Sequence, residues 1–161
     1  MVNAPSEPGS TPGSALKQRI LDAVKEAMRA RDKARLAALR LITAEIKRIE
    51  VDERIEPDDA RVLTILDRMI KQRNDSESQY RGAGRDDLAD VEAAEIAVIR
   101  EFMPAALSDA DIAAHIDAAV AASGAEGMRD MGKVMALLKP QLQGRADMGA
   151  VSGLVKARLG A

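Results

Sequence analysis

The sequence predicts an all-α protein, and three observations indicate this class. The chain has one Phe and one Tyr, and no Trp. Its hydrophobic fraction of 47% consists mostly of Ala, Leu, Ile, Val and Met. Sheet proteins are enriched in aromatic and β-branched side chains, whereas Ala, Leu, Met and the common charged residues favour helices. Apolar residues also recur three and four positions apart, and no segment alternates with a period of two over the length of a strand.

Helical spacing of apolar residues predicts seven helices. They lie at about residues 16–28, 32–56, 57–80, 87–102, 109–122, 131–139 and 148–159.

Residues that start or stop helices mark the boundaries. Asp32 can act as an N-cap, and Pro57 fits the first turn of a helix better than its interior. Gly82 and Gly84 end the third helix, and Asp86 or Asp87 caps the fourth. Pro104 ends that fourth helix, and the sequence SDAD from Ser108 matches a capping box.

The segmentation predicts two helical subdomains. Residues 15–105 form an N-terminal bundle of about four helices, and residues 106–161 form a C-terminal three-helix subdomain. A hinge is expected at Met103 to Leu107. Residues 1–14 are rich in Pro, Gly and Ser and predict a disordered tail, because they offer no apolar surface to bury.

Composition limits the classes of function. The formal charge of −2 does not indicate a nucleic-acid or membrane partner for the molecule as a whole, so any such surface must be local. The absence of cysteine excludes disulfides and thiolate sites and fits a reducing compartment. No signal peptide and no run of ~20 apolar residues is found. We therefore expect a cytoplasmic protein without a membrane partner.

Catalytic and metal-binding patterns are not found. His115 is the only histidine and lies among alanines, so a structural role is favoured over general-base catalysis. The carboxylates are scattered, and we expect no metal and no cofactor. The glycines of RGAGRDD, from Arg81, and GAEG, from Gly124, lie beside acids and fit helix ends better than phosphate loops.

Two segments are cationic. Between Arg29 and Arg48 there are seven cations and two acids, which we interpret as a solvated helix face balanced by acids of neighbouring helices. The second contrast is sharper, because residues 104–130 hold five acids and one cation, whereas residues 131–161 hold five cations and one acid. The C-terminal subdomain is thus polarised along its sequence, which favours a local basic face.

Apolar residues in the same subdomain are interpreted as core. Two stripes at helical spacing are expected to be buried: Met131, Val134, Met135 and Leu138, then Met148, Val151, Leu154 and Val155. Gly132, Gly144 and Gly149 permit a left-handed turn or the close approach of a helix or a ligand, and the sequence leaves both open.

Five blocks of the sequence resemble the GatB/YqeY family of bacterial proteins. The blocks are DKARLAALRLI (32–42), MIKQRNDSESQY (69–80), AGRDDLADVEAAEIAVIREFMP (83–104), DMGKVMALLK (130–139) and GRADMGAVSGLVKARL (144–159). The stand-alone members look like the helical tail of the B subunit of the tRNA-dependent amidotransferase. The resemblance implies a larger helical subdomain followed by a three-helix subdomain. It also implies that the three-helix subdomain contacts tRNA and that the protein has a role in translation.

The resemblance implies tRNA binding rather than catalysis. The chain lacks the catalytic cradle of the full B subunit and the Ser-Ser-Lys arrangement of an amidase. The leading hypothesis is a non-catalytic module that binds tRNA or another structured RNA. Its candidate RNA-binding residues are Gly132, Lys133, Lys139, Gly144, Arg145, Lys156 and Arg158. Two alternatives remain: a component associated with an amidotransferase, a carbon–nitrogen ligase with glutamine as amido-N-donor, and a helical module that docks on an amidotransferase or aminoacyl-tRNA synthetase complex.

Overall fold

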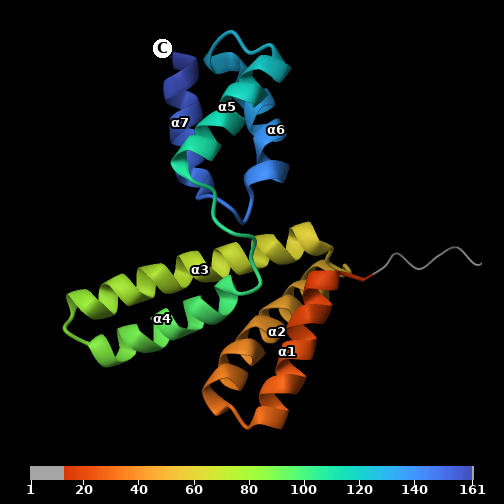
Figure 1. Ribbon diagram of the computed structural model, residues 1–161, viewed down its shortest axis with the longest axis vertical. Helices are drawn as coiled ribbons and strands as arrows, with labels where there is room; N and C mark the ends of the chain where they lie inside the picture. Colours follow the sequence, from red (N-terminus) through yellow and green to blue (C-terminus); the bar gives the residue numbers. More distant parts are fainter. Residues whose placement is uncertain (1–12, 161) are drawn as a thin grey trace, which may run out of the picture. The chain divides into compact units, whose positions relative to one another are not determined.

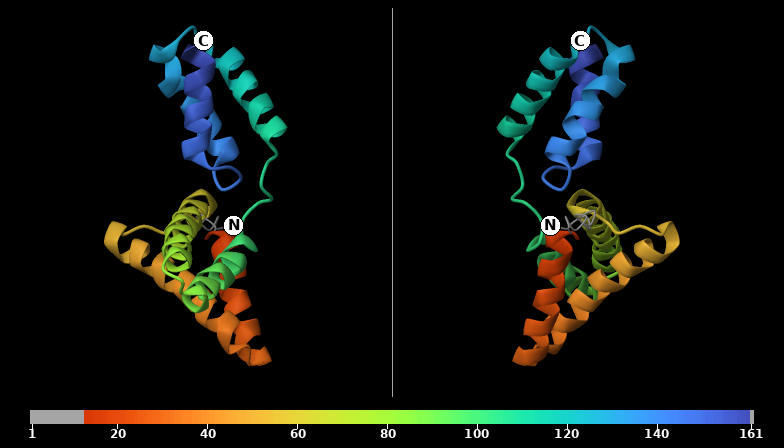
Figure 2. Two further views of the ribbon diagram at one scale, coloured as in Figure 1. Left: turned by 90° about the vertical axis from the view of Figure 1, so that its left-hand side faces the viewer. Right: turned by 90° about the vertical axis from the view of Figure 1, so that its right-hand side faces the viewer.

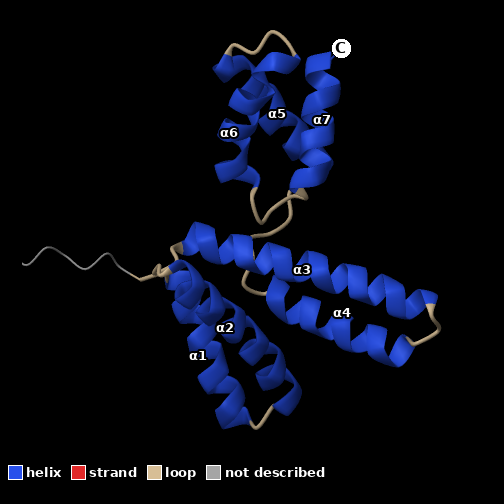
Figure 3. Cartoon of the chain, turned by 180° about the vertical axis from the view of Figure 1, so that it is seen from behind, coloured by secondary structure: helices blue, strands red, loops and turns tan. Residues whose placement is uncertain are grey.

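The computed structural model describes residues 13–160 and confirms the all-α class (Figures 1 and 3). No β-strand occurs in this range. The elements are α1 (Ala15–Ala30), α2 (Lys33–Glu53), α3 (Asp59–Gly82), α4 (Asp86–Arg100), α5 (Asp109–Ser123), the 3-10 turn η1 (Met128–Asp130), α6 (Met131–Leu142) and α7 (Met148–Gly160).

Internal contacts divide the chain into two compact units, the first ending at Val62 and the second beginning at Leu63. The first turn of α3 therefore belongs to the first unit and the rest of that helix to the second. The predicted boundary between residues 105 and 106 lies inside the second unit and stays a prediction.

In the first unit α1 and α2 form a helical hairpin (Figure 2). The predicted cap at Asp32 is confirmed, since its carboxylate accepts a hydrogen bond from the backbone N–H of Arg35 at 3.1 Å. The connection bends at Arg31, which adopts a left-handed conformation with φ 55°. The buried residues recur at helical spacing along one side of each helix: Leu16, Ile20, Ala23, Ala27, Ala38, Leu39, Ile42, Ile46 and Ile49.

Ser14 marks the start of α1 although the sequence suggested a tail up to this residue. Residues 1–12 of the predicted tail lie outside the described range. Ser14 is buried, its hydroxyl oxygen accepts from the N–H of Lys17, and its hydroxyl donates to the Asp59 carboxylate. That hydrogen bond, together with one from the N–H of Leu16, lowers the pKa of Asp59. Asp59 thus ties the start of α1 to the start of α3 within the first unit.

The junction between α2 and α3 differs from the prediction by a few residues. Helix α2 ends at Glu53 rather than near Glu56, and its C-cap Arg54 is left-handed with φ 52°. Pro57 is buried but precedes α3 by two residues, so it does not occupy the first turn. Asp58 starts the helix instead, because its carboxylate accepts from the N–H of Arg61 at 2.8 Å.

In the second unit α3 and α4 run antiparallel (Figure 1). The Arg73 guanidinium lies 2.8 Å from the Glu95 carboxylate and joins the two helices. Gly84, with φ 73°, makes the turn between them, as predicted. The prediction that Asp86 or Asp87 caps α4 is wrong by one or two residues. Arg85 occupies the N-cap position, and both acids lie in the first turn.

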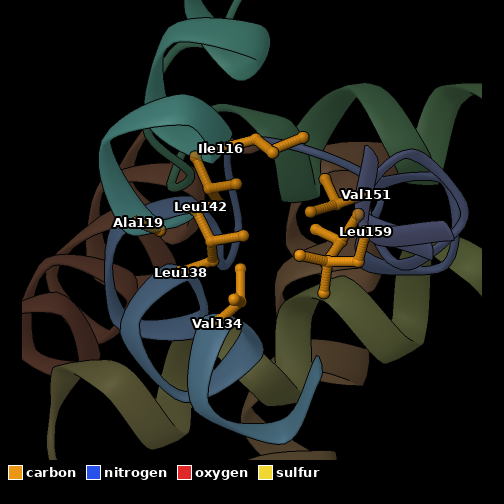
Figure 4. Close-up of a cluster of buried hydrophobic side chains, with 8 residues drawn as sticks. Ile116, Ala119, Val134, Leu138, Leu142, Val151 and Leu159 are labelled. Carbon is orange, nitrogen blue, oxygen red and sulfur yellow. The ribbon is translucent and has the colours of Figure 1, made fainter. Parts of the chain in front are cut away.

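Helices α5, α6 and α7 enclose a hydrophobic cluster (Figure 4). Its side chains point toward one another from all three helices: Ile116, Ala119, Val134, Leu138, Leu142, Val151, Val155 and Leu159. The predicted cap at Ser108 is confirmed, because its hydroxyl accepts from the N–H of Asp111 at 3.1 Å. Helix α6 continues through Pro140 to Leu142 instead of ending at Lys139. A proline inside a helix removes one hydrogen bond and crowds the carbonyl four residues earlier. Here the burial of Leu142 in the core offsets this cost and holds the last turn.

Leu154, which was predicted to be buried, is exposed, and so are Met28 and Val91, whose apolar side chains fall at helical spacing in the first and fourth predicted helices. Met28, Val91 and Leu154 have exposed fractions of 53%, 54% and 51%. Each lies at the edge of an apolar stripe. Helical spacing alone assigns the whole stripe to the core, but the neighbouring helices cover only its middle. The other predicted stripe residues of α6 and α7 are buried or half-buried.

Candidate nucleic-acid interface

The five C-terminal cations lie on α6, on α7 and in the turn between them. Lys133 and Lys139 are exposed on α6, and Lys156 and Arg158 are exposed on α7. Arg145 lies half-buried in the connecting turn. The buried positions of both helices face the hydrophobic cluster, so the four helical cations project away from it. They therefore lie on the solvent side of one three-helix group.

Some of this positive charge is neutralised within the same group. Lys133 Nζ lies 3.6 Å from Asp130 Oδ1, and Arg158 Nε lies 3.3 Å from Asp117 Oδ1. The pKa of Asp130 is lowered, first by a hydrogen bond from the N–H of Glu126 and also by the charge of Lys133. The Lys133, Arg158 and Asp117 side chains are exposed, whereas the Asp130 side chain is only 13% exposed. Solvent screens the exposed charges, so these pairs weaken but do not abolish the local positive charge.

Three cations remain without an ion pair in the described range: Lys139, Arg145 and Lys156. Their charge is not compensated by a nearby carboxylate within hydrogen-bonding distance. They are the strongest candidates for contact with an external anion.

The candidate glycines have different roles. Gly144 adopts φ 78°, and a Cβ there would lie 3.5 Å from Leu63 Cδ2 and 3.7 Å from Met103 Cε. This glycine is required by the left-handed turn, and its backbone packs against two apolar side chains. Gly132 has nothing within 4 Å of such a Cβ and no structural requirement of this kind. Gly149 donates its backbone N–H to Asp147 at the start of α7.

Hydrogen bonds fix the turn that carries Arg145. The Gln143 side-chain amide donates to the Thr64 hydroxyl at 2.7 Å. The Arg145 carbonyl accepts from the N–H of Leu107 at 2.9 Å, and the Arg145 N–H donates to the carbonyl of Leu142 at 2.9 Å. Both the N–H and the carbonyl of Arg145 are therefore held by hydrogen bonds, which fix the backbone at this residue.

A cleft of about 510 Å³ opens beside this turn. Its polar and charged lining comes from α3, from the end of α4 and from the turn: Asp67, Lys71, Asn74, Arg100, Arg145 and Asp147. Sequence analysis singled out only Arg145 among these as a ligand contact. Asp147 lies two residues from Arg145, whereas the residues of α3 and α4 lie far from it in the sequence. Lys71, Asn74 and Arg100 fall in the blocks 69–80 and 83–104 quoted above, and Asp67 falls in none of the blocks.

Other predicted features have plain structural roles. His115 is half-buried, with Nδ1 2.9 Å from Gln141 Oε1. Gly124 forms the left-handed C-cap of α5, in agreement with the interpretation of GAEG as a helix end. In residues 13–160 no group of three or more His, Cys, Asp or Glu side chains is placed to hold a metal ion. None of the described helices has the length and apolarity needed to cross a membrane.

The N-terminal cationic segment corrects one interpretation. Arg48 pairs with Glu45 at 2.6 Å and with Asp52 at 3.0 Å, and Lys47 lies 3.8 Å from Glu50. These acids belong to the same helix, α2, rather than to neighbouring helices. At the C-terminal end of the segment, Lys47 and Arg48 are therefore balanced by acids of their own helix.

The structure defines a small all-α protein whose C-terminal three-helix region is neutral in total but polarised in charge along its sequence. The family described as "Yqey-like protein" matches residues 17–159, and the chain belongs to this YqeY family.

Two curated relatives share the name "Altered inheritance of mitochondria protein 41, mitochondrial". The protein from Pyrenophora tritici-repentis is 28% identical over 156 residues, which cover 94% of this chain and 85% of the relative. The protein from Eremothecium gossypii is 35% identical over 98 residues, which cover 59% of this chain and 54% of the relative. The match to this second relative thus spans little more than half its length. These names place the relatives in mitochondria, and the cytoplasmic location of this chain stays a prediction.

Proposed function

We propose that this protein is a non-catalytic module that binds tRNA or another structured RNA through backbone phosphates. The observation that carries the proposal is the set of unpaired cations Lys139, Arg145 and Lys156 on one three-helix group. Lys133 and Arg158 lie on the same two helices and add contacts when phosphates replace their partners Asp130 and Asp117. Membership of the YqeY family agrees with this choice, because the family resembles the tail of a tRNA-dependent enzyme.

Recognition would rest on the shape and charge of the RNA rather than on its bases. Proteins that read single-stranded RNA stack bases on exposed aromatic side chains. Here Phe102 is buried and Tyr80 is half-buried, and the sequence has no other aromatic residue of this kind. Lys and Arg contacts to phosphates carry little sequence information, so a folded RNA with a defined backbone path is the fitting ligand.

A binding assay with matched variants tests the proposal. Fluorescence anisotropy with labelled tRNA at low salt should give saturable binding to the full chain. The double variant Lys139→Glu/Lys156→Glu should weaken it by at least tenfold, because two favourable phosphate contacts become repulsive. The double variant Lys25→Glu/Lys33→Glu, with exposed changes on α1 and α2, is the control matched for charge. Absence of binding at low salt, or equal losses in both variants, would contradict the proposal.

A docking module for a protein partner is the second candidate, and the first unit offers a specific observation for it. A groove of about 560 Å³ between α1 and α2 is lined by Ile20, Leu21, Ile46 and Ala44, with Arg40 and Lys47 also in its wall. Leu41, which follows the lining residue Arg40 on α2, is 44% exposed. Co-purification from the native cell would recover a protein, such as an amidotransferase or synthetase subunit, and Leu21→Glu would abolish its capture.

The assisted-catalysis alternative makes a separate prediction. If the protein supports a carbon–nitrogen ligase that uses glutamine, its addition should change the rate of glutamine- and ATP-dependent amidation of charged tRNA. An unchanged rate at saturating protein would dismiss this role while leaving RNA binding open.

A further inference from the structure

We propose that Arg100 and Arg145 form a clamp for one phosphate group in the cleft beside the Gln143–Asp147 turn. The inference rests on the proposed function for one point, namely that the bound anion is a phosphate. It adds a specific site and assigns Arg100, which no pattern in the sequence singled out, as a binding residue. Arg100 lies in the last turn of α4, and Arg145 lies in the turn between α6 and α7.

The acids of the cleft are already occupied by its lysine. Lys71 Nζ lies 3.7 Å from Asp67 Oδ2 and 3.9 Å from Asp147 Oδ1. The Asp147 carboxylate also accepts the N–H of Gly149 at 3.0 Å. The two acids share one lysine, and the lining also contains two arginines. The net charge of the lining is therefore +1. The cleft therefore favours an anion of small charge over a cation.

The two arginines have donors to offer. Neither Arg100 nor Arg145 has an ion pair or a side-chain hydrogen bond in the described range. A guanidinium presents a planar fork of N–H groups that matches the oxygens of a phosphate, and two of them can hold one group from different sides. The Asn74 side-chain amide lines the same cleft and adds a neutral donor.

The backbone beneath Arg145 is held in place before any ligand arrives. Gln143 is tied to Thr64, Arg145 is tied to Leu107, and the Gly144 backbone packs against Leu63 and Met103. A site fixed in this way loses little conformational entropy when it binds.

The size and the apolar part of the lining limit the ligand. A volume of about 510 Å³ fits a phosphate with one attached sugar-sized group. Ile70, Met103 and Ala146 supply apolar walls. The phosphate can belong to a nucleic-acid backbone or to a small free phosphorylated molecule, and both present the same group to the two arginines.

Titration with inorganic phosphate tests the clamp itself. In a nitrogen-15-labelled full chain, phosphate should shift the backbone amides of Gly144, Arg145 and Ala146 and the side-chain Nε–H signals of both arginines. The shifts should saturate, and sodium chloride at equal ionic strength should not reproduce them. Arg100→Gln and Arg145→Gln should each weaken phosphate binding by about tenfold, the loss of one charge-assisted contact. Arg68→Gln, an exposed change on α3 outside the cleft, is the matched control.

Two results would overturn the clamp. One is a phosphate titration without saturable shifts at the turn; the other is equal phosphate affinity in Arg100→Gln and in Arg68→Gln. Thermal unfolding of each variant shows that the fold is retained, and Arg145→Lys, which keeps the charge but not the fork, should recover only part of the affinity.

Anisotropy with tRNA then identifies the source of the phosphate. If Arg100→Gln weakens tRNA binding about tenfold, the clamp holds a backbone phosphate. If phosphate binds at the cleft while tRNA affinity is unchanged by Arg100→Gln, the clamp holds a small phosphorylated molecule. If tRNA does not bind at all, the proposed function fails, and the phosphate titration still decides whether the clamp exists.

Discussion

The Gln143 side-chain amide donates to the Thr64 hydroxyl at 2.7 Å and joins two residues 79 positions apart. This hydrogen bond links the turn before α7 to the second turn of α3. The turn carries Gly144 and Arg145, the two predicted RNA contacts that are half-buried, so the bond connects the stability of the second unit to the geometry of its candidate site.

Removing the amide should loosen the turn. Gln143→Ala leaves the Thr64 hydroxyl without this partner and should lower the free energy of unfolding by about 1 kcal/mol. Urea unfolding followed by circular dichroism measures the change. Gln72→Ala, an exposed change on α3, is the control and should stay within about 0.5 kcal/mol of wild type. Equal stabilities of the two variants would show that the bond does not hold the turn.

Two Gly→Ala changes should act in opposite directions. Gly144 has φ 78°, so Ala there is strained and should destabilise the fold by about 1 kcal/mol or more. Gly153 lies inside α7, and a Cβ there meets nothing within 4 Å. Gly153→Ala should therefore stabilise the fold by roughly 0.5–1 kcal/mol through helix propensity. Thermal unfolding of both variants checks the signs, and a shared sign contradicts the backbone assignment.

The contact between Ser14 and Asp59 should make stability depend on pH. The serine hydroxyl lowers the folded-state pKa of Asp59, so this contact stabilises the fold above the unfolded aspartate pKa of about 3.9. The contribution is lost as the pH falls through the lowered folded value. Ser14→Ala also removes the N-cap of α1 and should cost about 1 kcal/mol at neutral pH.

The difference between wild type and Ser14→Ala should therefore shrink in acid, and NMR titration should show the pKa of Asp59 moving up toward its ordinary value in the variant. A stability difference that stays constant from neutral pH to below the folded pKa would refute the linkage.

Neutralising Asp130 should strengthen RNA binding. Asp130→Asn removes the partner of Lys133 while the amide oxygen can still accept the N–H of Glu126. We expect a few-fold gain in tRNA affinity at low salt, which fades as salt screens the charge. Asp90→Asn, which removes an exposed acid paired with Arg81 on the α3–α4 hairpin, is the control. An equal gain in the control would attribute the effect to net charge alone.

The helices were predictable from the sequence because each has a local cause. Apolar spacing placed all seven, and short-range chemistry at Asp32, Ser108 and Gly84 placed several ends. The misses have physical reasons as well. Pro140 does not end α6, because the buried Leu142 stabilises one more turn by a contact that is distant in sequence. Leu154 is exposed because the faces that cover α7 are narrower than its apolar stripe.

The candidate site was predictable only in part. Charge polarity along residues 104–161 pointed to Lys139, Arg145 and Lys156, which have no ion pair in the described part of the chain. The same reasoning could not pair Arg158 with Asp117, because that ion pair depends on the packing of α7 beside α5. Asp130 and Lys133, in contrast, have the i,i+3 spacing at which helical side chains meet, and the pair could have been predicted. The sequence could not place Arg100 and Arg145 in one cleft, since the cleft depends on the tertiary fold.

The salt dependence of tRNA binding tests the central claim most directly. Each phosphate contact contributes about 0.9 to the negative slope of log K against log salt for duplex nucleic acid. The triple variant Lys139→Gln/Arg145→Gln/Lys156→Gln should therefore bind more weakly than wild type and with a slope shallower by between about 2 and 3. The same slope in wild type and variant, or no tRNA binding by the wild-type chain at low salt, would contradict the account.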